Sequence, residues 1–291
     1  MKKKRILALF LAAVSCLSLA VSVSAANTAA RKATDFRDFD RTAWYAEAVS
    51  TGVGNGLLYG KSATILDPNG NLTRAEMAAV INRSFGCYKA ADISRYKDVV
   101  RSKWYYNDIA LAVQMGTYNG RSASAMMPDA PITRQEAMTV VARALELDYP
   151  AYADTDLSKF ADAKDISAWA LPYIRAMVGA VYIRGRGKVL APQDNITRAE
   201  FAQIFYNIIG TYITAKGSYD KDIKGSVLIR TDDVTLQNMT VDGDLIIGCG
   251  AASGKITLDK VTVTGRLLVW GGGVAAIYCN NGTNMPEVVV A

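Results

Sequence analysis

The chain has 291 residues, with 33 basic and 27 acidic side chains, four cysteines and no histidine. Without histidine, a Ser-His-Asp or Cys-His hydrolase is excluded, although a pair of catalytic carboxylates is not. Cys87, Cys249 and Cys279 are too few and too far apart for a metal-binding set or a disulfide framework. We therefore expect small buried thiols, with a Cys249–Cys279 bond as the alternative, and predict no metal site, no cofactor and no catalytic residue.

Residues 1–25 have the pattern of a secretory signal peptide, with basic residues from Lys2 to Arg5 followed by an apolar run. We predict cleavage after Ala25, because the run ends there in small residues and continues past Cys16, the alternative lipoprotein site. No later stretch approaches the ~20 apolar residues of a membrane span, so no membrane insertion is expected after signal cleavage. Four basic residues leave with the signal, so 29 basic residues remain against 27 acids. This near balance of charge removes the main support for nucleic acid as a partner.

Three repeats follow a short linker at 26–35. They open with "FRDFDRTAW" at Phe36, "YKDVVRSKW" at Tyr96 and "FADAKDISAW" at Phe160. In each repeat an Asp precedes an Arg by 36 residues: Asp38 and Arg74, Asp98 and Arg134, Asp162 and Arg198. The repeats are assigned to 36–90, 91–150 and 151–213.

Each repeat is predicted to form a helix, a loop and a second helix. Apolar residues recur at helical spacing after the Trp, and a Gly-containing loop ends at Pro68, Pro128 or Pro192. A unit of about 50 residues is too small to bury a core of its own. We therefore expect the three units to share one.

The second helix of every unit begins at a repeated hexamer, "NLTRAE", "PITRQE" or "NITRAE". Its Thr and Glu lie three residues apart before an apolar helix face, as in a capping box. Capping explains these residues without a catalytic role: Thr73, Glu76, Thr133, Glu136, Thr197 and Glu200.

The arginine of each hexamer needs another explanation, because a helix N-terminus disfavours a positive side chain by roughly 0.3–1 kcal/mol. One interpretation is a carboxylate or phosphate site, since a guanidinium beside free helix amides binds anions well. The other is a salt bridge from each Arg to an acid of the next repeat. The residues alone favour neither for Arg74, Arg134 and Arg198.

Trp44, Trp104 and Trp169 also have two interpretations. Core packing is the commoner role of a large aromatic side chain, and a flat wall for a sugar ring is the alternative. The Asp that opens each unit either caps a loop, which we favour, or accepts hydrogen bonds from sugar hydroxyls.

Near residue 214 the pattern changes from helical spacing to short alternating runs of Val, Ile, Leu and Thr. "VTLQNMTVDGDLII" from Val234 matches "ITLDKVTVTGRLLV" from Ile256, a period of 22 residues that suggests coils of a parallel β-helix. We assign 214–222 to a linker and 223–291 to a β-solenoid segment of two clear coils and a weaker third. A stack this short is either truncated or covered at its open end.

The repeats resemble the S-layer homology domain, present as three tandem units over roughly residues 36–213. The resemblance rests on the aromatic-x-Asp opening, the Trp, the loops "NGLLYG" and "MGTYNG", the Pro and the hexamer. It implies an α+β multidomain protein: a mainly α-helical pseudo-threefold trimer, followed here by a small right-handed parallel β-helix-like segment. The second unit departs from the pattern at Gln135, and the third has Ala180 where the others have Gly56 and Gly116.

In that family the grooves of the trimer bind secondary cell-wall polysaccharide, typically through a pyruvylated amino sugar. Carried onto this chain, the resemblance implies that the three arginines meet the pyruvyl carboxylate. The three tryptophans, with Gly60 and Gly120, would then shape the grooves.

We therefore predict a secreted, non-catalytic protein of the cell wall or S-layer surface of a Gram-positive-type bacterium. The alternative is a wall-anchored lyase or hydrolase whose acids would be Asp232 and Asp233, or Asp242 and Asp244. These acids lie in turn-like contexts where Asp is expected for backbone reasons. Self-association through residues 223–291 is a third hypothesis, because an uncapped solenoid exposes strand edges.

Overall fold

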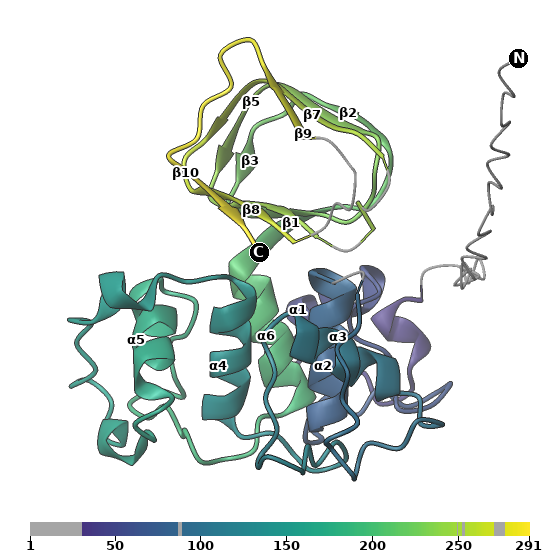
Figure 1. Cartoon of the computed structure of the whole chain (residues 1–291), viewed down its shortest axis with the longest axis vertical. Coiled ribbons are helices and arrows are strands. Elements are labelled where there is room, and N and C mark those ends of the chain that lie inside the picture. The colour runs from purple at the N-terminus through teal and green to yellow at the C-terminus, as the bar shows by residue number, and fades with distance from the viewer. Residues whose placement is uncertain (1–30, 87–88, 249, 252–253, 271–276) are drawn as a thin grey trace, which may run out of the picture.

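The computed structural model describes residues 31–86, 89–248, 250–251, 254–270 and 277–291. The expected signal peptide, Cys87 and Cys249 lie outside these residues. Figure 1 shows a helical part and, above it, strands coiled into a parallel solenoid of about three turns. The predicted combination of a helical part and a parallel β-solenoid is therefore confirmed. In the described part of the chain, no helix is both long and apolar enough to cross a membrane.

Each unit contributes two α-helices. They are α1 (Ala46–Gly54) and α2 (Arg74–Ser84), α3 (Tyr106–Gln114) and α4 (Arg134–Ala144), and α5 (Leu171–Gly179) and α6 (Arg198–Ile208). Short 3-10 turns lie at Ala33–Asp35, Tyr149–Tyr152 and Ala163–Asp165.

The capping boxes place the start of α2, α4 and α6. The Thr73 hydroxyl accepts from the backbone N–H of Glu76 at 3.2 Å, and the Glu76 carboxylate accepts from the backbone N–H of Thr73 at 3.0 Å. The same reciprocal pair joins Thr133 to Glu136 and Thr197 to Glu200. Each hexamer therefore starts its helix at the arginine.

The helices pair between units. α1 packs against α6, α3 against α2 and α5 against α4, so the first helix of each unit lies on the second helix of another. Backbone hydrogen bonds close the ring: Leu72 donates to Ile196 at 3.0 Å, Ile196 to Ile132 at 3.1 Å and Ile132 to Leu72 at 3.0 Å. This threefold cycle lets units too small to fold alone share a large core, and a second, smaller buried cluster lies where α1 packs on α6.

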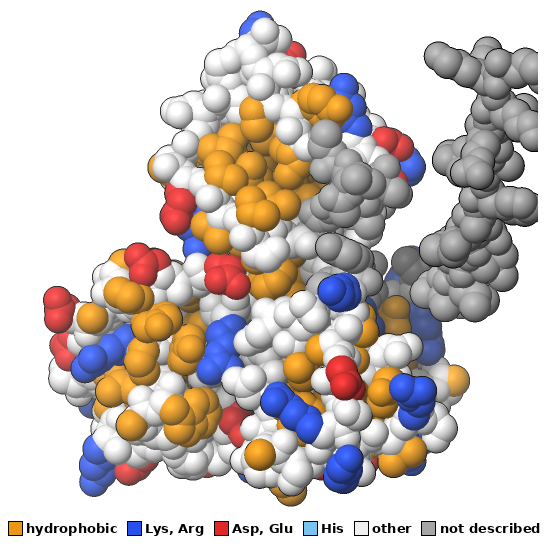
Figure 2. All heavy atoms as spheres, viewed as in Figure 1, with side chains coloured by type: hydrophobic (Ala, Val, Ile, Leu, Met, Phe, Trp, Pro, Cys, Tyr) orange, Lys and Arg blue, Asp and Glu red, His pale blue; other side chains and the backbone are white. Residues whose placement is uncertain are grey.

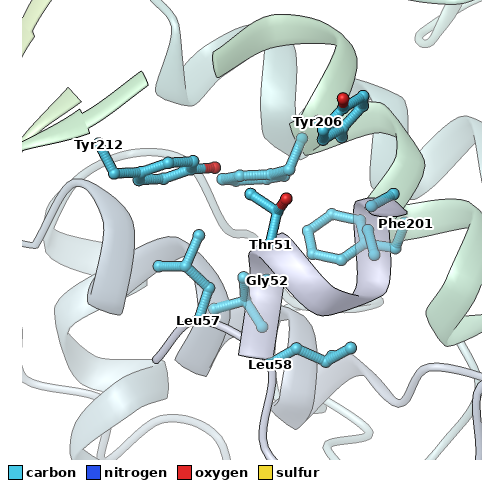
Figure 3. A pocket seen from close by; sticks show the side chains of 11 residues that line it. Thr51, Gly52, Leu57, Leu58, Phe201, Tyr206 and Tyr212 are labelled. Atoms are coloured by element: carbon cyan, nitrogen blue, oxygen red, sulfur yellow. The ribbon is translucent and has the colours of Figure 1, made fainter. Parts of the chain in front are cut away.

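Figure 3 shows where the first and third units meet, with Thr51 of α1, Phe201 and Tyr206 of α6 and Tyr212 around a small pocket. Its volume of about 10 Å³ is close to the space of a single water. The contact is therefore a packed closure of the ring and not a ligand site.

The solenoid starts directly at the end of α6. Its strands are β1 (Ile209–Ile213), β2 (Gly217–Tyr219), β3 (Ile223–Lys224), β4 (Ser226–Ile229), β5 (Val234–Asp242), β6 (Leu245–Ile247), β7 (Ile256–Val263), β8 (Arg266–Val269), β9 (Ile277–Asn280) and β10 (Glu287–Val290). They form two parallel sheets, ordered β1-β4-β6-β8-β10 and β2-β5-β7-β9, with β3 also paired to β5. Val234 pairs with Ile256 and Val241 with Val263, which reproduces the 22-residue period. β1 lies within the range expected for the third repeat and β2 within the expected linker, so the first coil begins earlier than residue 223.

Cys279 of β9 is exposed, so the expected buried thiol is wrong for this residue. The physical reason is that β9 pairs only with β7 among the described strands, so no described coil lies over Cys279.

The sheet of β1, β4, β6, β8 and β10 faces the helices (Figure 1). Leu228, Ile246 and Leu268 are fully buried in the helical core. The Trp270 indole N–H donates to the Ala144 carbonyl at 2.6 Å, and the Arg266 guanidinium donates to the Leu145 carbonyl at 3.1 Å. Because a helix end leaves carbonyls unpaired and carries partial negative charge, these donors cap α4.

In the third unit, the turn after the first helix has its positive-φ residue one position later than the sequence suggested. Gly56 and Gly116 follow α1 and α3 with φ of 64° and 69°, and the residue with the same geometry after α5 is Val181, with φ of 62°. The third-unit counterpart of the two glycines is therefore Val181 and not Ala180.

Candidate functional site

Three grooves lie between the units, and each takes residues from all three. We name them after the hexamer arginine that lines each one. The Arg74 groove has a volume of about 460 Å³, the Arg134 groove about 420 Å³ and the Arg198 groove about 330 Å³. The Arg74 groove is lined by Arg74, Tyr118, Gly120, Arg121, Glu136, Arg143 and Trp169; the Arg134 groove by Arg134, Arg184, Gly185, Arg186, Glu200, Asn207 and Trp44; the Arg198 groove by Arg198, Gly60, Lys61, Glu76, Arg83 and Trp104.

The hexamer arginines lie in the groove floors, with only 2 to 5 % of their surface exposed. Arg74 Nε donates to the Met126 carbonyl at 2.8 Å, and one of its terminal nitrogens donates to the Asn119 carbonyl at 2.8 Å. Its other terminal nitrogen lies 3.3 Å from Glu136 Oε1. The guanidinium thus joins two points of the α3–α4 loop to a capping-box carboxylate.

The same pairing runs around the ring. Arg134 lies 3.2 Å from Glu200, and Arg198 lies 3.2 Å from Glu76. Each Arg therefore pairs with an acid of the next repeat, which is the salt-bridge alternative that the sequence left open. Burial lowers the pKa of Arg134 and of Arg198, although their carboxylate partners oppose the shift.

Two carboxylates of the ring, Glu76 and Glu200, have lowered pKa values. Burial alone would raise the pKa of Glu76. Hydrogen bonds from Lys61 and the Thr73 amide, together with the charge of Arg198, lower this pKa by more, so the net shift is downward. The pKa of Glu200 is lowered in the same way, with Arg186 in the place of Lys61. A capping-box Glu here serves the helix and the buried Arg at once.

The three tryptophans lie at the rims of the grooves and are 51 to 63 % exposed. Trp169 lines the Arg74 groove, Trp44 the Arg134 groove and Trp104 the Arg198 groove. Because these side chains are exposed, the structure does not place them as core anchors. The neighbouring Tyr45 and Tyr105, which are buried, fill the core instead.

Gly60 and Gly120 line their grooves and also have a packing role. A Cβ at Gly60 would lie 2.3 Å from the ring of Phe36, and one at Gly120 would lie 2.4 Å from the ring of Tyr96. The aromatic that opens each unit therefore packs against a loop that has room only for glycine. Gly185 has the same place against Phe160 in the third unit.

Comparison with known proteins identifies the repeats. The model of the S-layer homology domain matches residues 35–78, 95–138 and 159–202. The chain carries three S-layer homology domains. This recognition agrees with the ring of paired helices and with the position of each hexamer at a helix start.

Relatives with these domains are surface and anchoring proteins as well as enzymes. The chain is 33% identical over 195 residues to the surface-layer 125 kDa protein of Lysinibacillus sphaericus, an alignment that covers 65% of this chain and 16% of the relative. It is 32% identical to a cellulosome-anchoring protein of Acetivibrio thermocellus, over 52% of this chain and 34% of the relative. It is 30% identical to an amylopullulanase of Thermoanaerobacterium thermosulfurigenes, over 57% of this chain and 9% of the relative.

The chain thus spans only 9 to 34% of the length of these relatives. S-layer homology domains together with S-layer relatives indicate a location on the bacterial cell surface. They also support anchoring to the cell wall.

Further basic side chains, whose role was not predicted from the sequence, line the S-layer homology grooves. Lys61 and Arg121 directly follow the groove glycines and pair with Glu76 at 2.6 Å and with Glu136 at 3.0 Å. The repeated signal was present, because a basic residue follows the groove glycine in all three units. Arg83 and Arg143, nine residues after the hexamer arginine, line the Arg198 and Arg74 grooves.

The Arg134 groove differs from the other two. Asn207 occupies the place of Arg83 and Arg143. Arg186 is held between Glu200 at 2.6 Å and Asp194 at 2.7 Å, so two carboxylates neutralise it. Each groove is lined by three basic side chains and one carboxylate, which in the Arg134 groove are Arg134, Arg184, Arg186 and Glu200. Asp194 adds a second carboxylate at Arg186, and this lowers the positive charge of the Arg134 groove.

The Asp that opens each domain binds backbone. Asp38 accepts from the N–H groups of Leu66 at 2.9 Å and Asp67 at 2.7 Å, and these bonds outweigh partial burial to lower its pKa. Asp98 and Asp162 accept two backbone N–H groups each at the same place in their own domains. These carboxylates are loop caps.

The acids of the enzymatic alternative lie in the solenoid. Asp232 and Asp233 both pair with Lys216, at 2.6 and 2.9 Å. Asp244 pairs with Arg266 at 2.8 Å, and Asp242 accepts from the Thr264 hydroxyl at 3.1 Å. Each carboxylate thus has a local partner. Over the described residues, no three His, Cys, Asp or Glu side chains are grouped as a metal site requires.

Proposed function

We propose that the chain is a non-catalytic wall anchor whose S-layer homology grooves bind an acidic secondary cell-wall polysaccharide. The observation that carries the proposal is a threefold repeated pairing of an exposed tryptophan with basic side chains in a groove. A flat exposed aromatic packs against the apolar face of a sugar ring, and basic groups attract its acidic substituent.

Within each groove we propose a division of roles. The buried Arg74, Arg134 and Arg198 stabilise the groove floor through their bonds to carbonyl and carboxylate groups. They contact the ligand only through the small part of each side chain that faces the groove. The more accessible Lys61 and Arg121 meet the acidic group, such as the carboxylate of a pyruvylated amino sugar. Gly60 and Gly120 shape the same loops.

The three grooves are proposed to bind unequally. Electrostatic attraction of an anionic glycan depends on the uncompensated positive charge in the groove. The Arg74 and Arg198 grooves therefore contribute most of the affinity, and the Arg134 groove contributes least because Arg186 is neutralised and Asn207 carries no charge.

The test is a pull-down of residues 26–291 with isolated cell-wall sacculi, before and after chemical removal of the secondary polysaccharide. Binding should be lost on removal. Trp169→Ala and Trp104→Ala should each weaken binding about tenfold, roughly 1.4 kcal/mol, and Trp44→Ala should weaken it less. All three side chains are exposed, so the fold should persist, as far-UV circular dichroism would show.

Tyr278→Ala is the matched control, because it removes an exposed aromatic that lies on the solenoid and outside the grooves. Undiminished binding by the triple tryptophan variant would rule out the grooves. Binding that survives removal of the polysaccharide would point to peptidoglycan as the partner.

A further inference from the structure

A further cavity lies between the first S-layer homology domain and the first coil of the solenoid. Its volume of about 830 Å³ exceeds that of each groove and is within the range of ligand pockets, roughly 300–1,000 Å³. We call it the interdomain cavity, and its lining includes Arg31, Phe36, Asn55, Tyr59, Thr214 and Arg230. Because Thr214 and Arg230 belong to the solenoid, both parts of the chain form this cavity.

The interdomain cavity adjoins the Arg198 groove. Leu58, Tyr59 and Gly60 line both spaces. Leu58 is buried and Gly60 has no side chain, so Tyr59 is the side chain that stands between the two. The groove and the cavity therefore form one continuous surface for a chain molecule.

Tyr59 presents an aromatic surface at this boundary. Its side chain is 58 % exposed, and the guanidinium carbon of Arg83 lies 3.8 Å from the centroid of its ring. Because Arg83 covers one face of the ring, the exposed area belongs to the other face and the edge. An exposed aromatic face held in this way can pack against the apolar face of a sugar ring.

The interdomain cavity is positively charged. Arg31 and Arg230 line it, and none of its described lining residues is acidic. The Arg31 guanidinium donates to the Ala63 carbonyl, and the Arg230 guanidinium donates to the Asn55 carbonyl. Carbonyl partners carry no net charge, whereas each groove places a carboxylate beside its buried arginine.

This composition differs from the surface around it. Figure 2 shows acidic, basic and hydrophobic side chains mixed over the face of the helical part that is turned to the viewer. A recess that combines two guanidinium groups with an aromatic ring, and whose described lining has no carboxylate, attracts an anionic ligand more strongly than a mixed surface does.

Tyr59 has no aromatic counterpart in the other two units. The Tyr59 carbonyl accepts a hydrogen bond from Arg198, as the Asn119 carbonyl does from Arg74, so Asn119 is the residue in the same place. In the third unit, Arg184 precedes the groove glycine. The aromatic boundary is therefore a feature of the Arg198 groove.

We propose that the interdomain cavity binds a further acidic unit of the polysaccharide chain whose neighbouring unit occupies the Arg198 groove. Arg31 and Arg230 bind the acidic substituent of this unit, and Tyr59 packs against its sugar ring. The inference rests on the proposed function of the grooves, and it makes the first coil of the solenoid part of the binding site.

The consequence is an affinity that increases with the length of the glycan. A fragment with one acidic unit fills the Arg198 groove alone, whereas a longer fragment also reaches the cavity. The second contact is made within a complex that has already formed, so it adds affinity without a second loss of translational freedom.

The test is isothermal titration calorimetry of residues 26–291 with polysaccharide fragments released from isolated sacculi and separated by length. Every chain carries Trp169→Ala, which weakens the Arg74 groove so that the Arg198 groove dominates. Arg31→Gln with Arg230→Gln should weaken binding of the longer fragments about tenfold, because two charge-assisted contacts are lost. The affinity for the shortest fragment that binds should stay unchanged. Trp104→Ala should weaken binding of both.

Two controls separate charge from fold. Lys221→Gln removes a positive charge from an exposed position of the first coil outside the cavity, and it should bind every fragment as the parent does. Arg31→Lys with Arg230→Lys keeps both charges and should recover most of the affinity that the glutamine pair loses. Far-UV circular dichroism would show that each variant is folded.

A second readout needs no substitution in the cavity. Phenylglyoxal modifies accessible arginines, and mass spectrometry of the peptides reports Arg31 and Arg230 separately. The longer fragments should protect both residues, and the shortest should protect neither. A parent chain that binds no fragment would overturn the proposed function of the grooves. Fragments that bind without protecting these arginines, or bind the glutamine pair as tightly as the parent, would overturn the interdomain site alone.

Discussion

At the scale of single residues, the turn after the first helix of each unit shows what the third unit lacks. Gly56, Gly116 and Val181 all have positive φ, a region in which a non-glycine residue costs about 1–3 kcal/mol. Val181 is β-branched, which makes the region less favourable still, and it is exposed, so its side chain gains little from burial. The third unit thus retains the turn without the glycine that would relieve its backbone strain.

Val181→Gly should therefore stabilise the chain by about 1 kcal/mol, after the extra flexibility of glycine in the unfolded state is subtracted. Urea unfolding should show a higher midpoint. The reverse change, Gly56→Ala, should lower the midpoint by a similar amount, because its φ of 64° costs the alanine although no atom lies within 4 Å of the added Cβ. A lower midpoint for Val181→Gly would show that this turn is not strained.

Several residue roles were predictable because they depend on near neighbours in sequence. The capping boxes follow from a Thr and a Glu three residues apart, and their partners are local. The roles of the arginines and tryptophans were left open, because they depend on which unit lies next to which. A tryptophan at a helix start looks the same in sequence whether it points into the core or into a groove.

At the scale of elements, the ring of Arg–Glu pairs joins the N-terminal turns of α2, α4 and α6. Glu76 caps α2 and also pairs with Arg198 of α6, so loss of its charge would weaken the capping box and leave a buried guanidinium unpaired. The helix starts are therefore connected to one another through their capping residues.

This connection predicts a pH dependence of the free energy of unfolding. The folded-state pKa values of Glu76 and Glu200 are lowered, so their stabilisation is present in full above the ordinary glutamate pKa of about 4.5 and is lost as pH falls through the lower folded values. Glu76→Gln should cost about 2 kcal/mol at pH 7 and reduce the slope below pH 4.5. Urea unfolding between pH 7 and pH 3 measures both, and an unchanged slope would contradict the role of Glu76.

The elements themselves were largely predictable, and their pairing was not. Helical and alternating periodicities locate six helices and the 22-residue coils, because these patterns repeat. The packing of α1 against α6 joins residues about 150 positions apart, which no local pattern records. The start of the first coil also escaped prediction, because β1 and β2 lack the repeated motif that marks β5 and β7.

At the scale of the whole molecule, the solenoid sheet serves as part of the helical core. Leu228, Ile246 and Leu268 are buried on the helix side of the sheet, while the alternate residues of the same strands fill the solenoid interior. One sheet therefore completes two cores. Arg266 and Trp270 add hydrogen bonds to the C-terminal carbonyls of α4 at the same boundary.

The shared sheet predicts that both parts unfold in one transition, which scanning calorimetry would record as a single peak. Leu267 and Leu268 are adjacent and buried, but Leu268 packs against the helices and Leu267 faces the solenoid interior. Either change to alanine should cost about 2–5 kcal/mol. Leu268→Ala should also uncouple the two parts and broaden or split the peak, whereas Leu267→Ala should lower the midpoint of a peak that stays single. If both variants gave the same peak shape, the sheet would not be what couples the S-layer homology domains to the solenoid.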